Sequence, residues 1–163
     1  MESGQVRKKA ALTIPFCVRL FLKLGDSIDE LYMNEAIVQA EKALRKGEVP
    51  VGVVIVKDKK IIARAYNKRE SKKDATCHAE ILAIRKACKY IKDWRLNGCV
   101  MYVTLEPCSM CMGAIKQARI SKVIYGTNNE KDIELPLVIS QNTMHKEECS
   151  NLLRDFFKKR RNQ

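Results

Sequence analysis

The segment that decides the fold reads TCHAE over residues 76–80, and the segment EPCSMC over residues 106–111 complements it. His78 can supply an imidazole nitrogen, and Cys108 and Cys111 can supply two thiolates from one helical turn. Three protein ligands leave one position of a tetrahedral Zn²⁺ open for water, as in catalytic rather than structural zinc sites. Glu80 is not needed as a ligand, so its carboxylate is free to move protons. The two segments predict a hydrolytic site with one zinc ion per chain.

A closed, structural zinc site would need a fourth ligand, and Cys77 and Cys99 are the candidates. Cys77 adjoins His78, and neighbouring residues on a helix do not share a face. Cys99 opens the run CVMYV, which is typical of a buried strand rather than a ligand loop. Alone, an H-x-E or a C-x-x-C is a weak signal, but their combination is more specific because the chain has only two histidines. The pattern favours the open, catalytic site.

Composition limits the class of protein. With 163 residues, 46% of them hydrophobic, the chain is long enough for one globular domain with a real core. Seven cysteines, an odd number at irregular spacing, indicate a reducing compartment, and we expect a cytoplasmic protein. A net charge of +12 indicates a polyanionic partner, with nucleic acid first and a membrane surface second.

Residues 1–26 differ from the rest of the chain. The basic run at 7–9 precedes an apolar stretch over 10–24 that Pro15, Arg19 and Lys23 interrupt. The stretch is a poor signal peptide and too short and charged for a transmembrane span. A short interfacial helix is the alternative, although Pro15 argues against a continuous one. We expect residues 1–26 to be a leader, disordered or weakly docked, and residues 27–163 to form the catalytic domain, which still carries +9.

Hydrophobic periodicity predicts an α/β fold. A helix should begin at Asp26 or Ser27 and stop at Gly47, and Thr76 could cap the helix that carries the first motif. Short β-branched runs, which are typical of strands, separate the expected helices. Expected strands are 53–56, 61–66, 99–105, 123–125 and a short fifth over 135–139, a polar loop is expected over 67–74, and further helices are expected over 109–117 and 144–159. This order implies a three-layer α-β-α domain with a central mixed sheet of about five strands.

From about Ile28 onward the chain resembles the bacterial tRNA-specific adenosine deaminases of the cytidine-deaminase-like zinc superfamily. The matching stretches are EVPVG at 48–52, Asn67, DATCHAEI at 74–81, YVTLEPCSMC at 102–111 and the segment from Glu148 to Arg161. H-x-E and P-C-x-x-C belong to the whole superfamily. The TLE lead-in and the FF…RR ending are typical of the tRNA branch. The resemblance implies conversion of the wobble adenosine of an anticodon to inosine by a homodimer.

The resemblance also implies roles for individual residues. His78, Cys108 and Cys111 would hold Zn²⁺, and Glu80 would shuttle protons between the attacking water, the base and the departing ammonia. Asn67 would hydrogen-bond the flipped base. The remaining candidates are pocket residues Val51, Ala79 and Leu105, and residues that hold the tRNA anticodon stem-loop, namely Phe156, Phe157, Lys158, Lys159, Arg160 and Arg161.

Each secondary role has a simpler alternative. Asn67 could be only a turn residue, the two phenylalanines could be core, and residues 158–161 could be a solvated helix end. His145 has no partner motif and is expected at the surface. The chain departs from the family at Cys77, which replaces a small residue, and over 127–137, where family members carry a longer loop that bears glycine.

Two other functions compete with a tRNA adenosine deaminase. A deaminase of a free base or nucleoside, of guanine or cytosine type, is chemically equal but does not need the positive charge. A non-enzymatic, zinc-stabilised RNA-binding module would leave Glu80 incidental. The charge on residues 27–163 favours the tRNA enzyme over the first alternative, and the placement of Glu80 favours it over the second.

Overall fold

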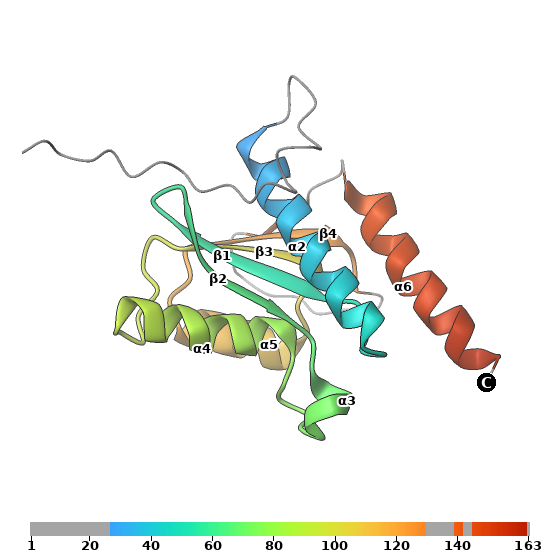
Figure 1. The fold of residues 1–163 in the computed structure, drawn as a ribbon. Coiled ribbons are helices and arrows are strands. Elements are labelled where there is room, and N and C mark those ends of the chain that lie inside the picture. Colours follow the sequence, from blue (N-terminus) through green and yellow to red (C-terminus); the bar gives the residue numbers. More distant parts are fainter. Residues whose placement is uncertain (1–26, 130–138, 142–144, 163) are drawn as a thin grey trace, which may run out of the picture.

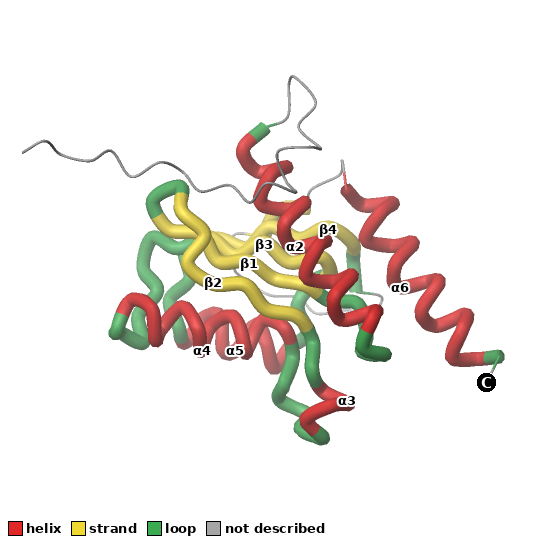
Figure 2. The backbone as a smooth tube through the Cα atoms, in the orientation of Figure 1, coloured by secondary structure: helices red, strands yellow, loops and turns green. Residues whose placement is uncertain are grey.

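A computed structural model describes residues 27–129, 139–141 and 145–162. The leader at 1–26 and most of the divergent segment at 127–137 lie outside this part of the chain. The described elements are helices and strands in a mixed order (Figures 1 and 2). They are α2 (Ile28–Arg45), β1 (Gly52–Lys57), β2 (Lys60–Tyr66), α3 (Arg69–Lys72), α4 (Ala79–Ile91), β3 (Val100–Leu105), α5 (Ser109–Gln117), β4 (Lys122–Thr127), β5 (Ile139–Gln141) and α6 (Lys146–Arg161).

The strands form one mixed sheet in the order β2-β1-β3-β4-β5. β1 is antiparallel to both β2 and β3, whereas β3, β4 and β5 run parallel. The start of β1 therefore lies at the same edge of the sheet as the ends of β2, β3 and β4. The predicted mixed sheet of about five strands is confirmed.

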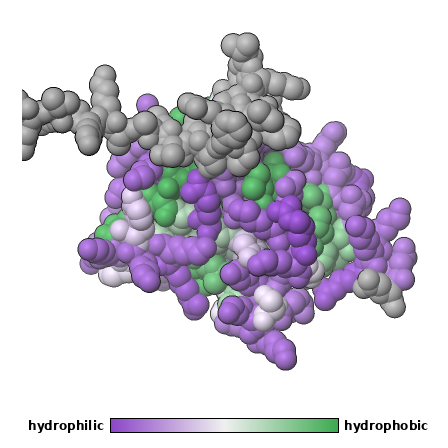
Figure 3. All heavy atoms as spheres, in the orientation of Figure 1, coloured by the Kyte–Doolittle hydropathy of each residue, from purple (hydrophilic) through white to green (hydrophobic). Residues whose placement is uncertain are grey.

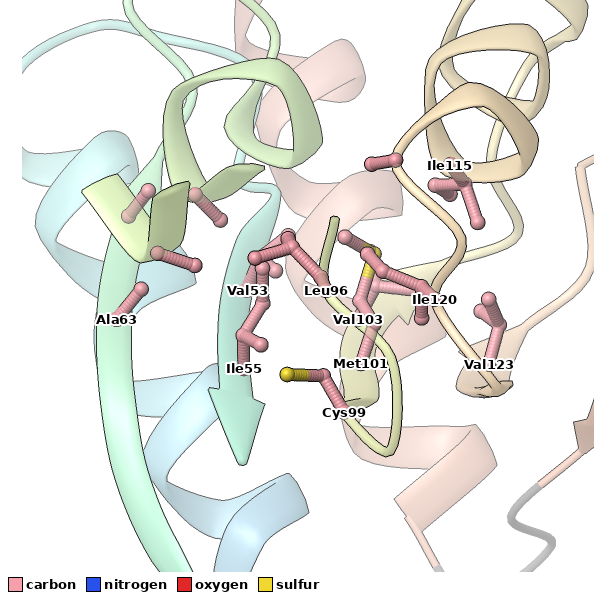
Figure 4. Close-up of a cluster of buried hydrophobic side chains, with 14 of the residues drawn as sticks. Val53, Ile55, Ala63, Leu96, Cys99, Met101, Val103, Ile115, Ile120 and Val123 are labelled. Carbon is pink, nitrogen blue, oxygen red and sulfur yellow. The ribbon is translucent and has the colours of Figure 1, made fainter. Parts of the chain in front are cut away.

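The two faces of the sheet pack on different helices, as Figure 1 shows. Along β1, Val53 and Ile55 belong to the core cluster that includes α4 and α5, and Val54 and Val56 belong to the cluster with α2. This alternation follows from the two-residue period of a strand. Figure 4 shows the first cluster, in which Met101 and Val103 of β3 lie with Ile115 of α5. The three-layer α-β-α prediction is confirmed.

Helix α2 sits close to the sheet because β1 begins with glycine. A Cβ at Gly52 would collide with the backbone of Ala36, Gln39 and Ala40 in α2. At the N-terminus of α2, Ser27 and Glu30 form a reciprocal capping box. Gly47, with φ of +71°, follows the C-terminus of α2. Both helix ends agree with the sequence prediction.

Several local predictions were wrong. Thr76 does not cap α4, because its hydroxyl and backbone N–H both donate to the carboxylate of Asp74. The residue at the N-cap of α4 is His78, whose side chain makes no capping bond. The expected loop over 67–74 contains the short helix α3. The described fifth strand is Ile139–Gln141, and residues 135–138 of the strand expected over 135–139 lie outside the described part.

His145 is half-buried rather than fully exposed. Its side chain is 14% exposed, and its Nδ1 lies 3.4 Å from the carboxylate of Glu148. It directly precedes α6. Among the described residues, no helix is both long and apolar enough to span a bilayer.

Candidate active site

The predicted metal ligands lie at the N-termini of two neighbouring helices. His78 is the N-cap of α4, and Cys108 is the N-cap of α5, with Cys111 in the first turn of α5. Neither N-cap side chain bonds to its own helix, so both can point toward a shared ion. The chain reaches these positions from β2 and β3, whose ends lie at one edge of the sheet. The sheet topology thus brings residues 78 and 108 together.

The three donor atoms have the spacing of a tetrahedral zinc site. Nδ1 of His78 lies 3.7 Å from Sγ of Cys108 and 3.5 Å from Sγ of Cys111. All three ligand atoms lie within 4.8 Å of one another. A tetrahedral ion with metal–ligand bonds of about 2.0 to 2.3 Å places its donors roughly 3.5 to 3.8 Å apart. The residues present therefore fit Zn²⁺ without rearrangement.

The same groups compete for charge. Hydrogen bonds from Cys111 and His78 lower the pKa of the Cys108 thiol to about 3. The hydrogen bond to Cys108, together with burial, raises the pKa of Cys111, because a second thiolate beside the first is unfavourable. The hydrogen bond to Cys108 also raises the pKa of His78. A donor set of this kind is satisfied by a divalent cation, which neutralises two adjacent thiolates.

Glu80 lies beside the ligands rather than among them. It is in the first turn of α4, is only 4% exposed, and does not belong to the group of three donors. Burial raises the pKa of its carboxyl group, and a hydrogen bond with Cys111 acts in the opposite direction. A carboxyl group so placed can take up and release protons next to the open metal position.

The structure does not support a fourth protein ligand within the described residues. The thiol of Cys77 donates to Asp74, with Sγ 3.3 Å from Oδ2. Cys99 is fully buried in the core cluster under α5. Neither sulfur belongs to the group of donor atoms around His78. The geometry agrees with the open site that the sequence indicated.

The predicted base-contacting residues lie at the same edge of the sheet. Asn67 directly follows β2, Val51 precedes β1, and Leu105 ends β3. The backbone N–H of Asn67 donates to the carbonyl of Val51 at 3.0 Å, and the next N–H donates to the carbonyl of Cys77. Ala79, the first residue of α4, is fully buried. The fold therefore places Val51, Asn67 and Leu105 at the sheet edge from which the chain reaches the donor group, and Ala79 next to His78.

Sequence reasoning missed the residue that holds Asn67. Glu48 is 0% exposed, and its carboxylate accepts hydrogen bonds from the side-chain amide of Asn67 and from two backbone N–H groups of α3. Its position in the EVPVG stretch was noted only as part of a resemblance. The useful signal was a charged residue directly before an apolar strand, although sequence alone could not name its partners.

Helix α6 carries the predicted RNA-contacting residues, and its C-terminal end lies next to α3. Phe156 is 7% exposed, whereas Phe157 is 47% exposed and meets it edge to face. Phe156 is thus a core residue, the simpler alternative for the two phenylalanines, whereas Phe157 is exposed. Arg160 reaches α3, with its guanidinium 3.8 Å from the carboxylate of Glu70. The basic end of α6 thus lies next to the loop that carries Asn67.

Comparison with known proteins agrees with this site. The sequence model of the MafB19-like deaminase family matches residues 28–161. The tRNA-specific adenosine deaminase of Bacillus subtilis strain 168 is 44% identical over 146 residues, which cover 82% of this chain and 91% of that protein. The chain belongs to the tRNA-specific adenosine deaminases.

Solved structures extend the comparison to the fold of the deaminase. One, from studies of A-to-I editing by tRNA:A34 deaminases at the wobble position of transfer RNA, superposes with a TM-score of 0.70. The two sequences are 35% identical, and the superposition covers 75% of this chain and 98% of the solved chain. Guanine deaminase from Bacillus subtilis has a TM-score of 0.59 at 32% identity, over 82% of the deaminase and 94% of that chain. Both likenesses show that this chain has the fold of a known deaminase.

Proposed function

We propose that this protein hydrolyses the wobble adenosine of a tRNA anticodon to inosine and ammonia. The observation that carries the proposal is the group of His78, Cys108 and Cys111 at tetrahedral spacing, with the buried Glu80 beside it. Membership of the tRNA-specific adenosine deaminases supports adenosine as the base. The A-to-I relative supports the wobble position.

His78, Cys108 and Cys111 would hold one Zn²⁺ per chain, which supplies Lewis acidity and a water with a pKa near 7. In the reaction, water adds at C6 of adenine, and the C6–N6 bond breaks to release ammonia. Glu80 would take one proton from the water and deliver it to ring nitrogen N1, and would then carry the second proton, from the C6 hydroxyl, to the departing amine. Its burial excludes bulk water as a competing proton donor.

The base reaches this site only if it leaves its stack, so residues around the entrance would hold the rest of the RNA. Val51, Ala79 and Leu105 would line the pocket, and Asn67 would hydrogen-bond the base. Phe157 is the exposed member of its pair and is free to stack on a neighbouring base. Arg161 and its neighbours Lys158, Lys159 and Arg160 would contact phosphates.

A second group of basic residues supports a nucleic-acid substrate. The ammonium groups of Lys46 and Lys68 lie 5.3 Å and 5.0 Å from the ring centre of Tyr66, which directly precedes Asn67. Lys86 adds a third positive charge that acts on the same tyrosine. Hydrophilic side chains cover most of the face shown in Figure 3. No described carboxylate pairs with these three lysines, so no salt bridge neutralises their charges, which remain available to a phosphate backbone.

The test uses three substrates with the zinc-loaded protein. A synthetic anticodon stem-loop with adenosine at the wobble position should yield inosine at that position, detected by nuclease digestion and chromatography. Free adenosine and free guanine should yield little ammonia. Inosine in the stem-loop supports the proposal, and ammonia from guanine alone would replace it with the free-base alternative, which the likeness to guanine deaminase keeps in the test. We further propose that the chain forms a homodimer, and sedimentation of the same sample tests this.

A further inference from the structure

Glu48 is a buried carboxylate that the reaction itself does not use. It lies between the end of α2 and the start of β1 and is 0% exposed. Its Oε1 accepts from the backbone N–H of Ser71 at 2.8 Å, and its Oε2 accepts from the N–H of Glu70 at 3.0 Å. Nδ2 of Asn67 lies 3.4 Å from the same Oε2. A buried charge needs several such donors, so this arrangement is specific.

The contact with Asn67 determines which way its amide faces. The oxygen and nitrogen ends of an asparagine amide are nearly equal in size, so sterics alone do not fix its orientation. A carboxylate accepts a hydrogen bond from the NH₂ end and repels the oxygen end. The Asn67 backbone is held independently by the carbonyl of Val51. Glu48 therefore holds the amide in one polarity.

We propose that Glu48 is a positioning residue for base selectivity, acting through the amide of Asn67. With one N–H of Nδ2 held by Glu48, the second N–H of Nδ2 remains to donate to an acceptor on the base, and Oδ1 can only accept. With Glu48 neutralised, the amide could turn over, and the pocket would tolerate either polarity. This inference rests on the proposed function, in which Asn67 contacts the flipped base.

The same carboxylate links the pocket to the proposed RNA-binding helix. The residue at the N-cap of α3, Lys68, makes no side-chain capping bond, and Glu48 instead accepts the N–H groups of Glu70 and Ser71. The side chain of Glu70 in turn meets Arg160 of α6. Burial alone would raise the pKa of Glu48, but these hydrogen bonds and the charge of Arg160 lower it, so the carboxylate is ionised at neutral pH.

A double-mutant cycle tests the proposal. The variants are Glu48→Gln, Asn67→Ala and the double variant, assayed as zinc-loaded full chains on stem-loops with adenosine or cytidine at the wobble position. Both bases carry an amine to be removed but differ in their acceptors away from that carbon, because only adenine has an imidazole nitrogen, N7. Glu48→Gln should lower kcat/KM for adenosine by about tenfold and lower the adenosine-to-cytidine ratio. In the Asn67→Ala background, Glu48→Gln should leave that ratio unchanged.

A matched control separates positioning from folding. Glu35 is another buried glutamate, 4% exposed, on α2, where it pairs with Arg64. Glu35→Gln should leave the adenosine-to-cytidine ratio unchanged even if it lowers the melting temperature. Glu48→Asp, which keeps the charge, should restore part of the ratio lost in Glu48→Gln. If Glu48→Gln changed the adenosine-to-cytidine ratio equally with Asn67 and with alanine at position 67, the proposal would be overturned. Glu48 would then act on the fold and not through the amide of Asn67.

A second readout does not depend on activity. The ¹⁵N signal of the Asn67 side-chain amide, assigned by its loss in Asn67→Ala, should shift in Glu48→Gln, and its protons should exchange faster with solvent. An unchanged amide signal would sink the inference whatever the substrate. If the native protein forms no inosine but the amide signal shifts, the proposed function fails while the contact between Glu48 and Asn67 stands.

Discussion

Lys46 donates a hydrogen bond to the phenol oxygen of Tyr66, with Nζ and Oη 2.8 Å apart. This bond, together with the charges of Lys68, Lys46 and Lys86, lowers the pKa of Tyr66. Tyr66 ends β2 and the next residue is Asn67, so the lysines surround the strand end that leads into the pocket. The relationship concentrates positive charge where the proposed substrate would enter.

Removing two of these charges should weaken RNA binding. The double variant Lys46→Gln/Lys68→Gln should lower affinity for an anticodon stem-loop and reduce the slope of log affinity against log salt by about 1 to 2. Fluorescence anisotropy at several salt concentrations measures both. The control is Lys89→Gln/Lys116→Gln, which removes the same charge from the last turns of α4 and α5, at the opposite end of the sheet. Equal losses in both double variants would show that only net charge matters.

The zinc content of purified variants should distinguish a metal ligand, such as Cys108, from the proton carrier Glu80. Cys108→Ser should lose zinc, because it removes one of three donors, whereas Glu80→Ala should keep about one zinc per chain and lose turnover. Elemental analysis of the purified variants checks this. Cys88→Ser is the matched control, since Cys88 is not in the donor group and its Sγ lies 3.6 Å from the carbonyl oxygen of Trp94. An active Glu80→Ala protein would contradict the proposed mechanism.

Acid should remove the stability that Glu48 contributes. The pKa of Glu48 is depressed in the folded state, so its contribution is present above its unfolded-state pKa of about 4.3. That contribution is lost as pH falls through the folded-state pKa. The difference in unfolding free energy between the native protein and Glu48→Gln should therefore be larger at neutral pH than near pH 3. Urea denaturation at both pH values measures it, and a difference independent of pH would argue against an ionised Glu48.

Packing of α6 on the sheet should depend on Gly126. A Cβ at this position of β4 would collide with Sγ of the buried Cys149 and lie 3.0 Å from the carbonyl oxygen of Thr104. Gly126→Ala should destabilise the protein by about 1 to 3 kcal/mol. Gly113→Ala in α5, where a Cβ meets nothing within 4 Å, should instead stabilise it by about 0.5 to 1 kcal/mol. Urea denaturation measures the unfolding free energy of both variants. Equal changes in that free energy would contradict the packing argument.

Residues 27–163 should be sufficient for the activity. The metal donors, Glu80 and the strands that position them all lie within this range. Deleting residues 1–26 should therefore leave the melting temperature and inosine formation nearly unchanged. Calorimetry and the stem-loop assay compare the two chains. A fall of many degrees in melting temperature would show that the leader packs on the domain.

The sequence by itself determined the features that depend on residue type and short spacing. His78, Glu80, Cys108 and Cys111 could be singled out as candidates because metal ligation and proton transfer need those side chains, and because Cys108 and Cys111 lie one helical turn apart. The strands from Gly52 to Tyr66 and the ends of α2 could be predicted from β-branched runs and from caps that act within a few residues.

Tertiary structure decided what depends on partners distant in sequence. Helix α3 forms within a polar stretch because Glu48, more than twenty residues earlier, accepts its free N–H groups. The sequence could not show whether the hydroxyl of Thr76 would cap a helix or donate to Asp74, because either hydrogen bond uses the same hydroxyl group. Likewise, Phe156 is buried and Phe157 exposed because α6 turns one face toward the rest of the fold. The polarity of Asn67 belongs to the same class, since only folding brings a buried carboxylate to its amide.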